Sequence, residues 1–440
     1  MKIAILGSVA LPVPPPSQGG TEWIAYYQAE GLAKVGHKVI LFAAHGSKQG
    51  AYELVEVGGG DTVTGSSAKT PGRWPRDSFQ VEELRRASVI PPSRSPFGHL
   101  EGGIHTSPLP SPSRRGDFGV MSLVESSRNL RRENVYLAQA VQQLIDRKND
   151  YDIILNNMRG EAVFLPFAPL CGALGKPFVN VMHLPIFPEL ALLFKQYNTP
   201  IITISNAQRK DFPDLNYLAT IYNCVDTEKF IPSTVASSEG PAASPPSCRA
   251  GLDGHAKRAP GSRHPLFSSD LGSDYLLMMG SISPHKNQAG AIKVAKKLGM
   301  KLILAGKIND QKYFDQLKRD IDGKQIRWLG ELDFAEKLKL YQNARAFLFP
   351  ILWEEPFGLV MIEAMACGTP VVAFGNGAIP EVVVDGLTGY VIENNSEEKM
   401  TEAVKNIDKI KRSDCRKHVL ENFTVEKMIA DYEKALLSLL

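Results

Sequence analysis

Short apolar runs alternate with segments of helical periodicity along both halves of the chain. The runs of the first half are KIAILG, HKVILFAA, YDIILNN, KPFVNVMH and PIITIS, and those of the second half are YLLMMG, KLILAG, IRWLG, AFLFP and TPVVAF. Consecutive apolar positions rich in Val and Ile are typical of strands that are buried on both faces of a parallel sheet. The pattern therefore predicts an α/β fold with two doubly wound, Rossmann-like domains.

Helices are expected between these runs. They cover about residues 21–35, 288–298, 311–321 and 334–344. A further helix, from Phe357 to Cys367, would be apolar on nearly all sides, which is typical of a buried helix. Glu363 lies in the middle of it. Because Glu is almost never fully buried without a partner, we expect Glu363 to bind either another part of the protein or a ligand.

Two segments do not follow this alternation. Residues 60–118 and 232–270 are rich in Pro, Ser, Gly and Arg and have no periodicity. Such a composition cannot bury enough apolar surface to offset the entropy of ordering, so both are predicted to be disordered insertions. The first lies within an N-terminal domain of residues 1–231, and the second precedes a C-terminal domain of residues 271–420. Residues 421–440 are predicted to form a helix that packs back toward the N-terminal domain.

Composition and charge narrow the class of protein. The 440 residues are 43% hydrophobic and 22% charged with a net charge of +3, which fits a globular protein and gives no reason to expect nucleic acid as a partner. The five cysteines are scattered without CxxC spacing, which argues against a zinc site or a disulfide framework and favours the cytoplasm. No apolar run reaches the roughly 18 residues of a membrane span. The N-terminus resembles a short signal peptide, but a buried first strand explains it better.

Two loops that follow predicted strands have features of anion sites. Gly19 and Gly20 precede the first helix, where a ligand can approach the backbone and free N–H groups. A tight turn between strand and helix explains the same glycines equally well. In the second half, Lys286 follows the strand that ends at Gly280 and lies next to a helix start. A lysine there is favourable if an anion lies between it and the helix, and a solvent-facing lysine is the alternative.

The apolar helix and a histidine are the other candidates. The amides of the segment PFGL would be unpaired donors at the helix N-terminus, with Pro356 in the first turn. The carboxylate of Glu363 can accept two hydrogen bonds from a vicinal diol such as a ribose. The alternative is an ion pair between Glu363 and a nearby Lys or Arg. His183 ends another predicted strand, at the edge where open α/β sheets bind ligands, although a single His is more often structural.

Together these motifs resemble the retaining glycosyltransferases of family 4, which have the GT-B fold. The E-x7-E signature is present as Glu355 and Glu363. The segments GGTEWIAYYQAEGLAKVGHKVILFA, YNCVDTEKF, GSISPHKN and GNGAIPEVVVDGLTGYVI resemble other motifs of that family. The similarity covers nearly all of the chain except the two insertions. It implies two facing Rossmann-like domains with the active site in the cleft between them.

The resemblance also implies roles for the candidate residues. In the C-terminal domain, Glu363 would hold the ribose of a nucleotide-sugar donor, Glu355 would face the sugar, and Lys286 would neutralise the diphosphate. The amides of the donor loops would complete this site, at Gly280, Ser281, Phe357, Gly358 and Leu359. Replacement of Glu363 by alanine is then expected to weaken donor binding at little cost in stability.

On the acceptor side, the resemblance implies that His183, Gly19 and Gly20 lie near the reacting centre. The expected reaction retains the anomeric configuration and needs neither a metal nor a cofactor. It moves a hexose, with UDP-glucose the favoured donor, to a small or lipid-linked hydroxyl acceptor. The expected location is the cytoplasm, where peripheral contact with the inner membrane is compatible with the sequence.

Two positions depart from the family pattern. Ser281 stands where the pattern has an arginine, which removes a charge-assisted contact to the diphosphate, and Cys224 replaces a glycine. A non-catalytic nucleotide-sugar-binding protein of the same fold is therefore an alternative. A third hypothesis, an NAD-dependent dehydrogenase, lacks the GxGxxG fingerprint and leaves both glutamates without a role.

Overall fold

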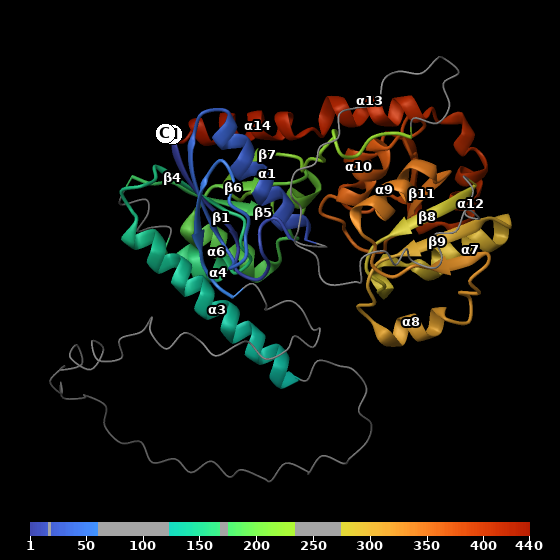
Figure 1. Ribbon diagram of the computed structural model, residues 1–440, viewed down its shortest axis with the longest axis horizontal. Helices are drawn as coiled ribbons and strands as arrows, with labels where there is room; N and C mark the ends of the chain where they lie inside the picture. The colour runs from blue at the N-terminus through green and yellow to red at the C-terminus, as the bar shows by residue number, and fades with distance from the viewer. Residues whose placement is uncertain (16–18, 60–122, 168–174, 234–273) are drawn as a thin grey trace, which may run out of the picture. The chain divides into compact units, whose positions relative to one another are not determined.

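Two parallel sheets organise the chain (Figure 1). The computed structural model describes residues 1–15, 19–59, 123–167, 175–233 and 274–440. Within these ranges the first sheet has seven strands in the order β3-β2-β1-β4-β5-β6-β7, and the second has six in the order β10-β9-β8-β11-β12-β13. Every pair of neighbouring strands is parallel. The predicted pair of doubly wound α/β domains is therefore confirmed.

The first sheet contains each of the five predicted strands and two that were not predicted, β3 and β7. Its strands are β1 (Lys2–Ser8), β2 (Lys38–Ala43), β3 (Glu53–Glu56), β4 (Ile153–Asn156), β5 (Phe178–Met182), β6 (Ile201–Thr203) and β7 (Tyr217–Thr220). The helical segments between them are α1 (Gly20–Lys34), α3 (Leu123–Asp146), α4 (Glu161–Phe164), η1 (Leu165–Phe167), α6 (Pro188–Tyr197) and η2 (Ala207–Arg209).

The second sheet likewise contains its five predicted strands and one more, β13. Its strands are β8 (Tyr275–Met279), β9 (Lys301–Ala305), β10 (Ile326–Trp328), β11 (Ala346–Phe349), β12 (Val371–Phe374) and β13 (Gly389–Ile392). The helices up to β12 are η4 (Pro284–Lys286), α7 (Gln288–Leu298), α8 (Gln311–Leu317), α9 (Phe334–Asn343) and α10 (Leu359–Ala366). The later ones are α11 (Ile379–Val382), η5 (Glu393–Asn395), α12 (Glu397–Lys405), η6 (Ile407–Lys409), α13 (Arg412–Asn422) and α14 (Val425–Leu437).

Each sheet has one point at which the strand order reverses. In the first sheet β1 lies between β2 and β4, and in the second β8 lies between β9 and β11. The chain leaves neighbouring strands in opposite directions at such a point, which opens a crevice at the carboxyl ends of the two strands. The loops that follow β8 and β11 are therefore the expected location of a ligand site.

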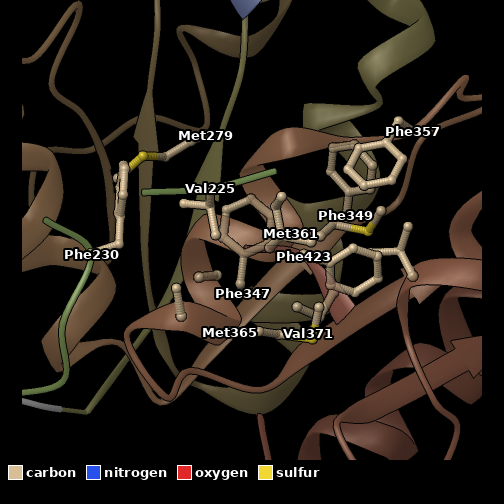
Figure 2. Packing of buried hydrophobic residues seen from close by; sticks show 14 of the residues in the cluster. Val225, Phe230, Met279, Phe347, Phe349, Phe357, Met361, Met365, Val371 and Phe423 are labelled. Carbon is tan, nitrogen blue, oxygen red and sulfur yellow. The ribbon is translucent and has the colours of Figure 1, made fainter. Parts of the chain in front are cut away.

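The core around α10 is continuous with residues from the end of the first half (Figure 2). Phe347, Met361 and Val371 are fully buried in it, as the apolar helix pattern predicts. Val225 joins this core, and its amide donates a hydrogen bond of 2.9 Å to the carbonyl of Phe423. Five of the eight residues of α10 are buried, which explains why the helix is almost entirely apolar.

The last helix, α14, packs against α1 of the first half (Figure 1). The Ile429 side chain packs directly onto Gly31, where a Cβ would lie only 2.3 Å from Cγ1 of Ile429. Tyr432 is fully buried, and Glu433 pairs with His37 at 2.8 Å. The C-terminal segment therefore completes the helical layer around α1.

Two helix boundaries differ from the prediction by more than one residue. The apolar helix begins at Leu359 rather than Phe357, because Gly358 precedes it as N-cap with φ of 87°, a left-handed conformation that favours glycine. Pro356 is thus outside the helix, and its predicted place in the first turn is wrong. Helix α8 ends at Leu317, four residues earlier than predicted.

Both predicted insertions lie outside the described residues, apart from residues 232 and 233. The described residues up to 59 and from 128 onward belong to one compact unit. None of the helices in the described ranges combines the length and the apolar composition that a membrane span requires.

Candidate functional site

Two predicted site residues meet where the strand order of the second sheet reverses. Lys286 follows β8 and Glu355 follows β11, and Nζ of Lys286 lies 3.0 Å from Oε2 of Glu355. Their side chains are 17% and 12% exposed. The pair is thus largely shielded from bulk water, and a small part of each side chain remains accessible.

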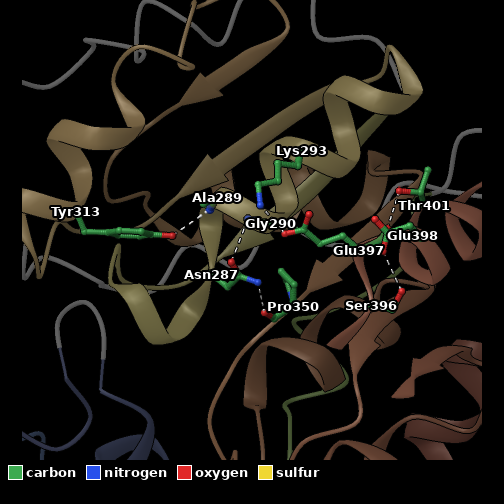
Figure 3. A network of polar contacts seen from close by, with 10 residues as sticks. All are labelled: Asn287, Ala289, Gly290, Lys293, Tyr313, Pro350, Ser396, Glu397, Glu398 and Thr401. Atoms are coloured by element: carbon green, nitrogen blue, oxygen red, sulfur yellow. Dashed lines mark hydrogen bonds and ion pairs between the residues drawn. The ribbon is translucent and has the colours of Figure 1, made fainter. Parts of the chain in front are cut away.

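Asn287 fixes the loop that carries Lys286 (Figure 3). Its Oδ1 accepts a hydrogen bond of 3.1 Å from the amide of Gly290 and so caps the N-terminus of α7. Its Nδ2 donates a hydrogen bond of 3.0 Å to the carbonyl of Pro350, just beyond β11. One side chain therefore ties the loop after β8 to the loop after β11.

Aromatic groups surround the ion pair. The indole N–H of Trp353 donates to Oε2 of Glu355 at 3.0 Å, and Nζ of Lys286 lies 5.2 Å from the centre of the Trp353 ring. His285 contacts the same indole edge-on, at 5.5 Å between ring centres. Burial and the charge of Lys286 lower the pKa of His285. Trp353 and His285 were not predicted as site residues, although His285 lies within the segment GSISPHKN and Trp353 lies two positions before Glu355.

Glu363 has two protein partners, both on α9. Nζ of Lys337 lies 2.8 Å from each carboxylate oxygen, and the hydroxyl of Tyr341 donates to Oε2 at 2.8 Å. Burial and the negative charge of Glu363 raise the pKa of Tyr341 well above its usual value, so Tyr341 remains a donor. Of the two alternatives for Glu363, the ion pair with a protein cation is therefore present. The Glu363 side chain is still 15% exposed.

The N-terminus of α10 is fixed by aromatic packing. Phe357 is buried against the rings of Tyr222 and Phe423, at 6.0 and 5.8 Å between ring centres. Gly358 then turns the chain so that Leu359 begins the helix. The first amides of a helix have no acceptor within it, so this end offers hydrogen-bond donors and a positive partial charge.

The glycine turn of the first half lies next to this helix end. Gly19 is the N-cap residue of α1, and Gly20 is its first residue. A Cβ on Gly20 would lie 2.9 Å from Cδ1 of Leu359. Two motifs more than three hundred positions apart in the sequence are therefore neighbours. In the same turn, the Ser8 hydroxyl donates to the buried carboxylate of Glu22 at 3.1 Å.

Gly280 and Ser281 form the start of the loop after β8. The amide of Gly280 donates to the carbonyl of Ala305 at 2.9 Å, and the carbonyl of Ser281 accepts from Nε2 of Gln288 at 2.9 Å. The loop is thus anchored to β9 and to α7 through its backbone. The side chain of Ser281 takes no part in these two contacts.

His183 follows β5 in the first sheet. Its Nε2 lies 2.9 Å from Oδ1 of Asn157, whose Nδ2 donates to Oε1 of Gln28 at 2.7 Å. Because Oδ1 can only accept, Nε2 carries the proton and Nδ1 has the free lone pair. Burial lowers the pKa of His183 to about 4, so the ring is neutral at pH 7. In the described part of the chain no hydrogen bond or ion pair links it to Lys286 or Glu355.

Glu381 of α11 binds the first half of the chain. Its carboxylate accepts hydrogen bonds from the amides of Asn206 and Ala207, at 2.8 and 2.7 Å, and from the hydroxyl of Tyr222 at 2.9 Å. Burial, together with this hydrogen bond, raises the pKa of Tyr222 to about 12. The glutamate belongs to the segment GNGAIPE that resembles a family motif, and its partners could not be predicted from the sequence.

Residues 267–420 match the family model described as Glycosyl transferases group 1. Among curated proteins, the chain is 35% identical over 129 residues to the O-antigen chain mannosyltransferase B of Escherichia coli, which covers 28% of this chain and 33% of that protein. It is 27% identical over 213 residues to the alpha-maltose-1-phosphate synthase of Mycobacterium tuberculosis, which covers 45% of this chain and 49% of that protein. The chain thus matches at most about half the length of these relatives.

Solved structures of similar fold cover the whole chain. The glycosyltransferase AviGT4 of avilamycin A biosynthesis has a TM-score of 0.59 at 20% identity, with 98% of that chain covered. The sucrose-phosphate synthase of Thermosynechococcus elongatus has a TM-score of 0.64 at 14% identity, also with 98% covered. Anabaena HepE, solved with UDP and glucose, has a TM-score of 0.60 at 17% identity, with 100% covered.

These comparisons confirm the predicted GT-B fold. The residues that match the glycosyl transferases group 1 model span the second sheet from β8 to β13, and they include Lys286, Glu355 and Glu363. The dehydrogenase hypothesis finds no support in them.

Proposed function

We propose that the protein is a glycosyltransferase that moves a hexose from a nucleotide-diphosphate sugar to a hydroxyl acceptor. The observation that carries this proposal is the shielded pair of Lys286 and Glu355 at the carboxyl ends of β8 and β11, inside the matched domain. A cation and a carboxylate at this point of a doubly wound sheet suit a ligand that has both a phosphate and sugar hydroxyls.

In this proposal Lys286 turns from Glu355 to the diphosphate when the donor binds. Its ammonium has three protons and can contact a phosphate oxygen while it remains close to Glu355. Trp353 keeps its hydrogen bond to Glu355, so the carboxylate stays oriented and can accept hydrogen bonds from sugar hydroxyls. Glu363 accepts from the ribose. The backbone of Gly280 and Ser281 and the amides of Phe357, Gly358 and Leu359 complete the donor site.

The proposed chemistry is a same-face substitution that retains the anomeric configuration. The bond between C1 and the diphosphate oxygen breaks as the acceptor oxygen bonds to C1, and the acceptor proton passes to the leaving phosphate. Lys286 and the N-terminus of α10 stabilise the charge that develops on the leaving group. Because these groups suffice for that task, no divalent metal and no cofactor are required. On the acceptor side, neutral His183 accepts a hydrogen bond through Nδ1, and Gly19 and Gly20 let the acceptor approach the backbone.

UDP-glucose is the favoured donor, and GDP-mannose is the main competitor. UDP and glucose are bound in the HepE structure, whereas mannosyltransferases are among the curated relatives. The acceptor is a small or lipid-linked molecule, in the cytoplasm or at the inner membrane.

A non-catalytic nucleotide-sugar-binding protein is the second candidate. It is favoured by Ser281, because the loss of a cation weakens stabilisation of the leaving group more than it weakens sugar binding.

The test combines binding with turnover. Purified protein is heated with UDP, GDP, UDP-glucose and GDP-mannose, and a selective rise in melting temperature identifies the donor by mass action. Donor hydrolysis and transfer are then measured with and without EDTA. Binding with EDTA-resistant turnover supports the enzyme, whereas binding without any turnover favours the second candidate. No nucleotide-dependent stabilisation would refute both.

A further inference from the structure

The ion pair between Lys337 and Glu363 is the second cation–carboxylate contact near the site. Lys337 and Tyr341 are four positions apart on α9, so they share one face of that helix, and both reach the carboxylate of Glu363 on α10. Neither residue belongs to the motifs that predicted the site. Those motifs therefore assign no role to this second lysine near the site.

The surroundings of this pair make it half-buried and adjustable. Tyr341 is fully buried, whereas the Lys337 side chain is 29% exposed. Nζ of Lys337 also lies 5.3 Å from the centre of the Phe230 ring, a cation–π contact. Of the two partners of Glu363, Tyr341 is thus fixed, and Lys337 can move.

The hydrogen-bonding capacity of Glu363 leaves room for a ligand. A carboxylate offers about four acceptor positions. Tyr341 uses one on Oε2, and Lys337 contacts both oxygens at 2.8 Å. One position on Oε1 remains, and a small shift of Lys337 frees a second. The two hydroxyls of a ribose can then bind while both protein partners stay in contact.

Charge gives Lys337 a second role. A nucleoside diphosphate is an anion, and Glu363 by itself would repel it. The ammonium of Lys337 cancels that charge at 2.8 Å. This matters more here because Ser281 stands where the family pattern has an arginine. Of the residues the structure describes, Lys337 is the cation in contact with Glu363.

We propose that Lys337 is a positioning residue for nucleotide recognition, which orients the Glu363 carboxylate toward the ribose and offsets its charge when the diphosphate binds. The proposal rests on the proposed function. Lys337 acts through Glu363 and touches neither the sugar nor the bond that breaks.

The test measures a preference that a purely structural residue would not change. Dissociation constants are determined by calorimetry for UDP and GDP and for their 2′-deoxy forms, with wild type, Lys337→Met and Lys337→Arg. Lys339→Met is the matched control, because it removes the same charge from an exposed position of the same helix. Glu363→Gln gives the ratio of ribonucleotide to deoxyribonucleotide affinity that is expected when the ribose contact is weakened.

We expect Lys337→Met to weaken binding of the ribonucleotide about tenfold, which is the effect of losing one charge-assisted contact. The preference for ribose over deoxyribose should fall toward that of Glu363→Gln. Lys337→Arg should keep both the ribonucleotide affinity and the preference for ribose within about threefold of wild type. Lys339→Met should change neither quantity. Tyr341→Phe deletes one hydroxyl and should lower the same preference, so the test does not depend on the folding of Lys337→Met.

An unchanged preference in Lys337→Met and Tyr341→Phe would overturn the proposal, even if overall affinity fell. Failure of the proposed function looks different, because wild type would then bind none of the four nucleotides.

Discussion

Lys286 and Glu355 are 69 positions apart in the sequence, yet Nζ and Oε2 are separated by only 3.0 Å. They meet because β8 and β11 are hydrogen-bonded neighbours and each residue lies in the loop after its strand. Asn287 bridges the same two loops. The proposed donor site is therefore built at the carboxyl ends of two neighbouring strands, and substitutions within it should affect function more than folding.

Lys286→Met should lower kcat about 10²- to 10³-fold, because a fixed cation that stabilises the leaving diphosphate is lost. Lys293→Met is the control, since Lys293 lies on the following helix and forms an exposed pair with Glu397. Steady-state kinetics with the donor identified by thermal shift provide the measurement. A loss below tenfold would mean that another group stabilises the leaving diphosphate.

Trp353→Phe should lower kcat about tenfold, because it keeps the aromatic contact with Lys286 but deletes the N–H that orients Glu355. The melting temperature should change little. Equal kinetics in wild type and variant would show that Glu355 does not need this hydrogen bond during turnover.

Ser281→Arg should tighten donor binding about tenfold, because it adds a charge-assisted contact to the diphosphate. The backbone contacts of the loop do not involve the side chain at this position, so the loop should tolerate the change. Ser281→Met, of similar length without charge, is the control. Weaker binding by the arginine variant than by the methionine variant would argue that the loop does not face the diphosphate.

Glu363→Ala should weaken donor binding and also destabilise the fold by about 1–3 kcal/mol, because the buried Tyr341 hydroxyl and the half-buried Lys337 ammonium lose their acceptor. This corrects the sequence-based expectation of little cost in stability, which assumed that no charge would be left behind. Urea unfolding measures the difference. Glu363→Gln keeps an acceptor for Tyr341 and should cost less. Equal stability of wild type and the alanine variant would contradict the role of this network.

His183 should make stability depend on pH in the acidic range. Its folded pKa of about 4 is below the unfolded value of 6.5, so the unfolded state binds more protons between these values. The contribution is complete above pH 6.5 and is lost as pH falls from there through about 4. Between pH 7.5 and 5, wild type should lose about 1–2 kcal/mol more than His183→Gln. Parallel pH profiles of the two proteins would refute the burial of a neutral ring.

The ten predicted strands are present because each is a continuous apolar run, and burial on both faces makes that signal strong. The unpredicted strands β3, β7 and β13 have four residues each and lie at sheet edges, and β3 begins and ends with glutamate. Helix α3 was missed despite a clear signal, since the buried residues Leu137, Ala140 and Leu144 recur at helical spacing.

The sequence indicated the individual site residues better than their partners. Lys286 and Glu355 could be predicted because strand ends and a glutamate motif identify their loops. An ion pair of Glu363 with a Lys or Arg was one of the two expected alternatives, but Lys337 could not be identified as the partner, because the pair joins two helices and no spacing rule relates residues 26 positions apart. Trp353 was also missed, because an aromatic residue beside a motif is commonly part of the core.

Because α14 packs against α1, the packing of the C-terminal helix determines how the two halves of the chain can be produced as separate fragments. A fragment that ends before residue 424 would expose the flank of α1 at Gly31 and leave His37 without Glu433. Independent production of the first half therefore requires the last seventeen or so residues to be supplied, for example by circular permutation that joins them ahead of Met1. A tag or fusion partner attached at Leu440 would therefore be carried by the N-terminal half of the protein.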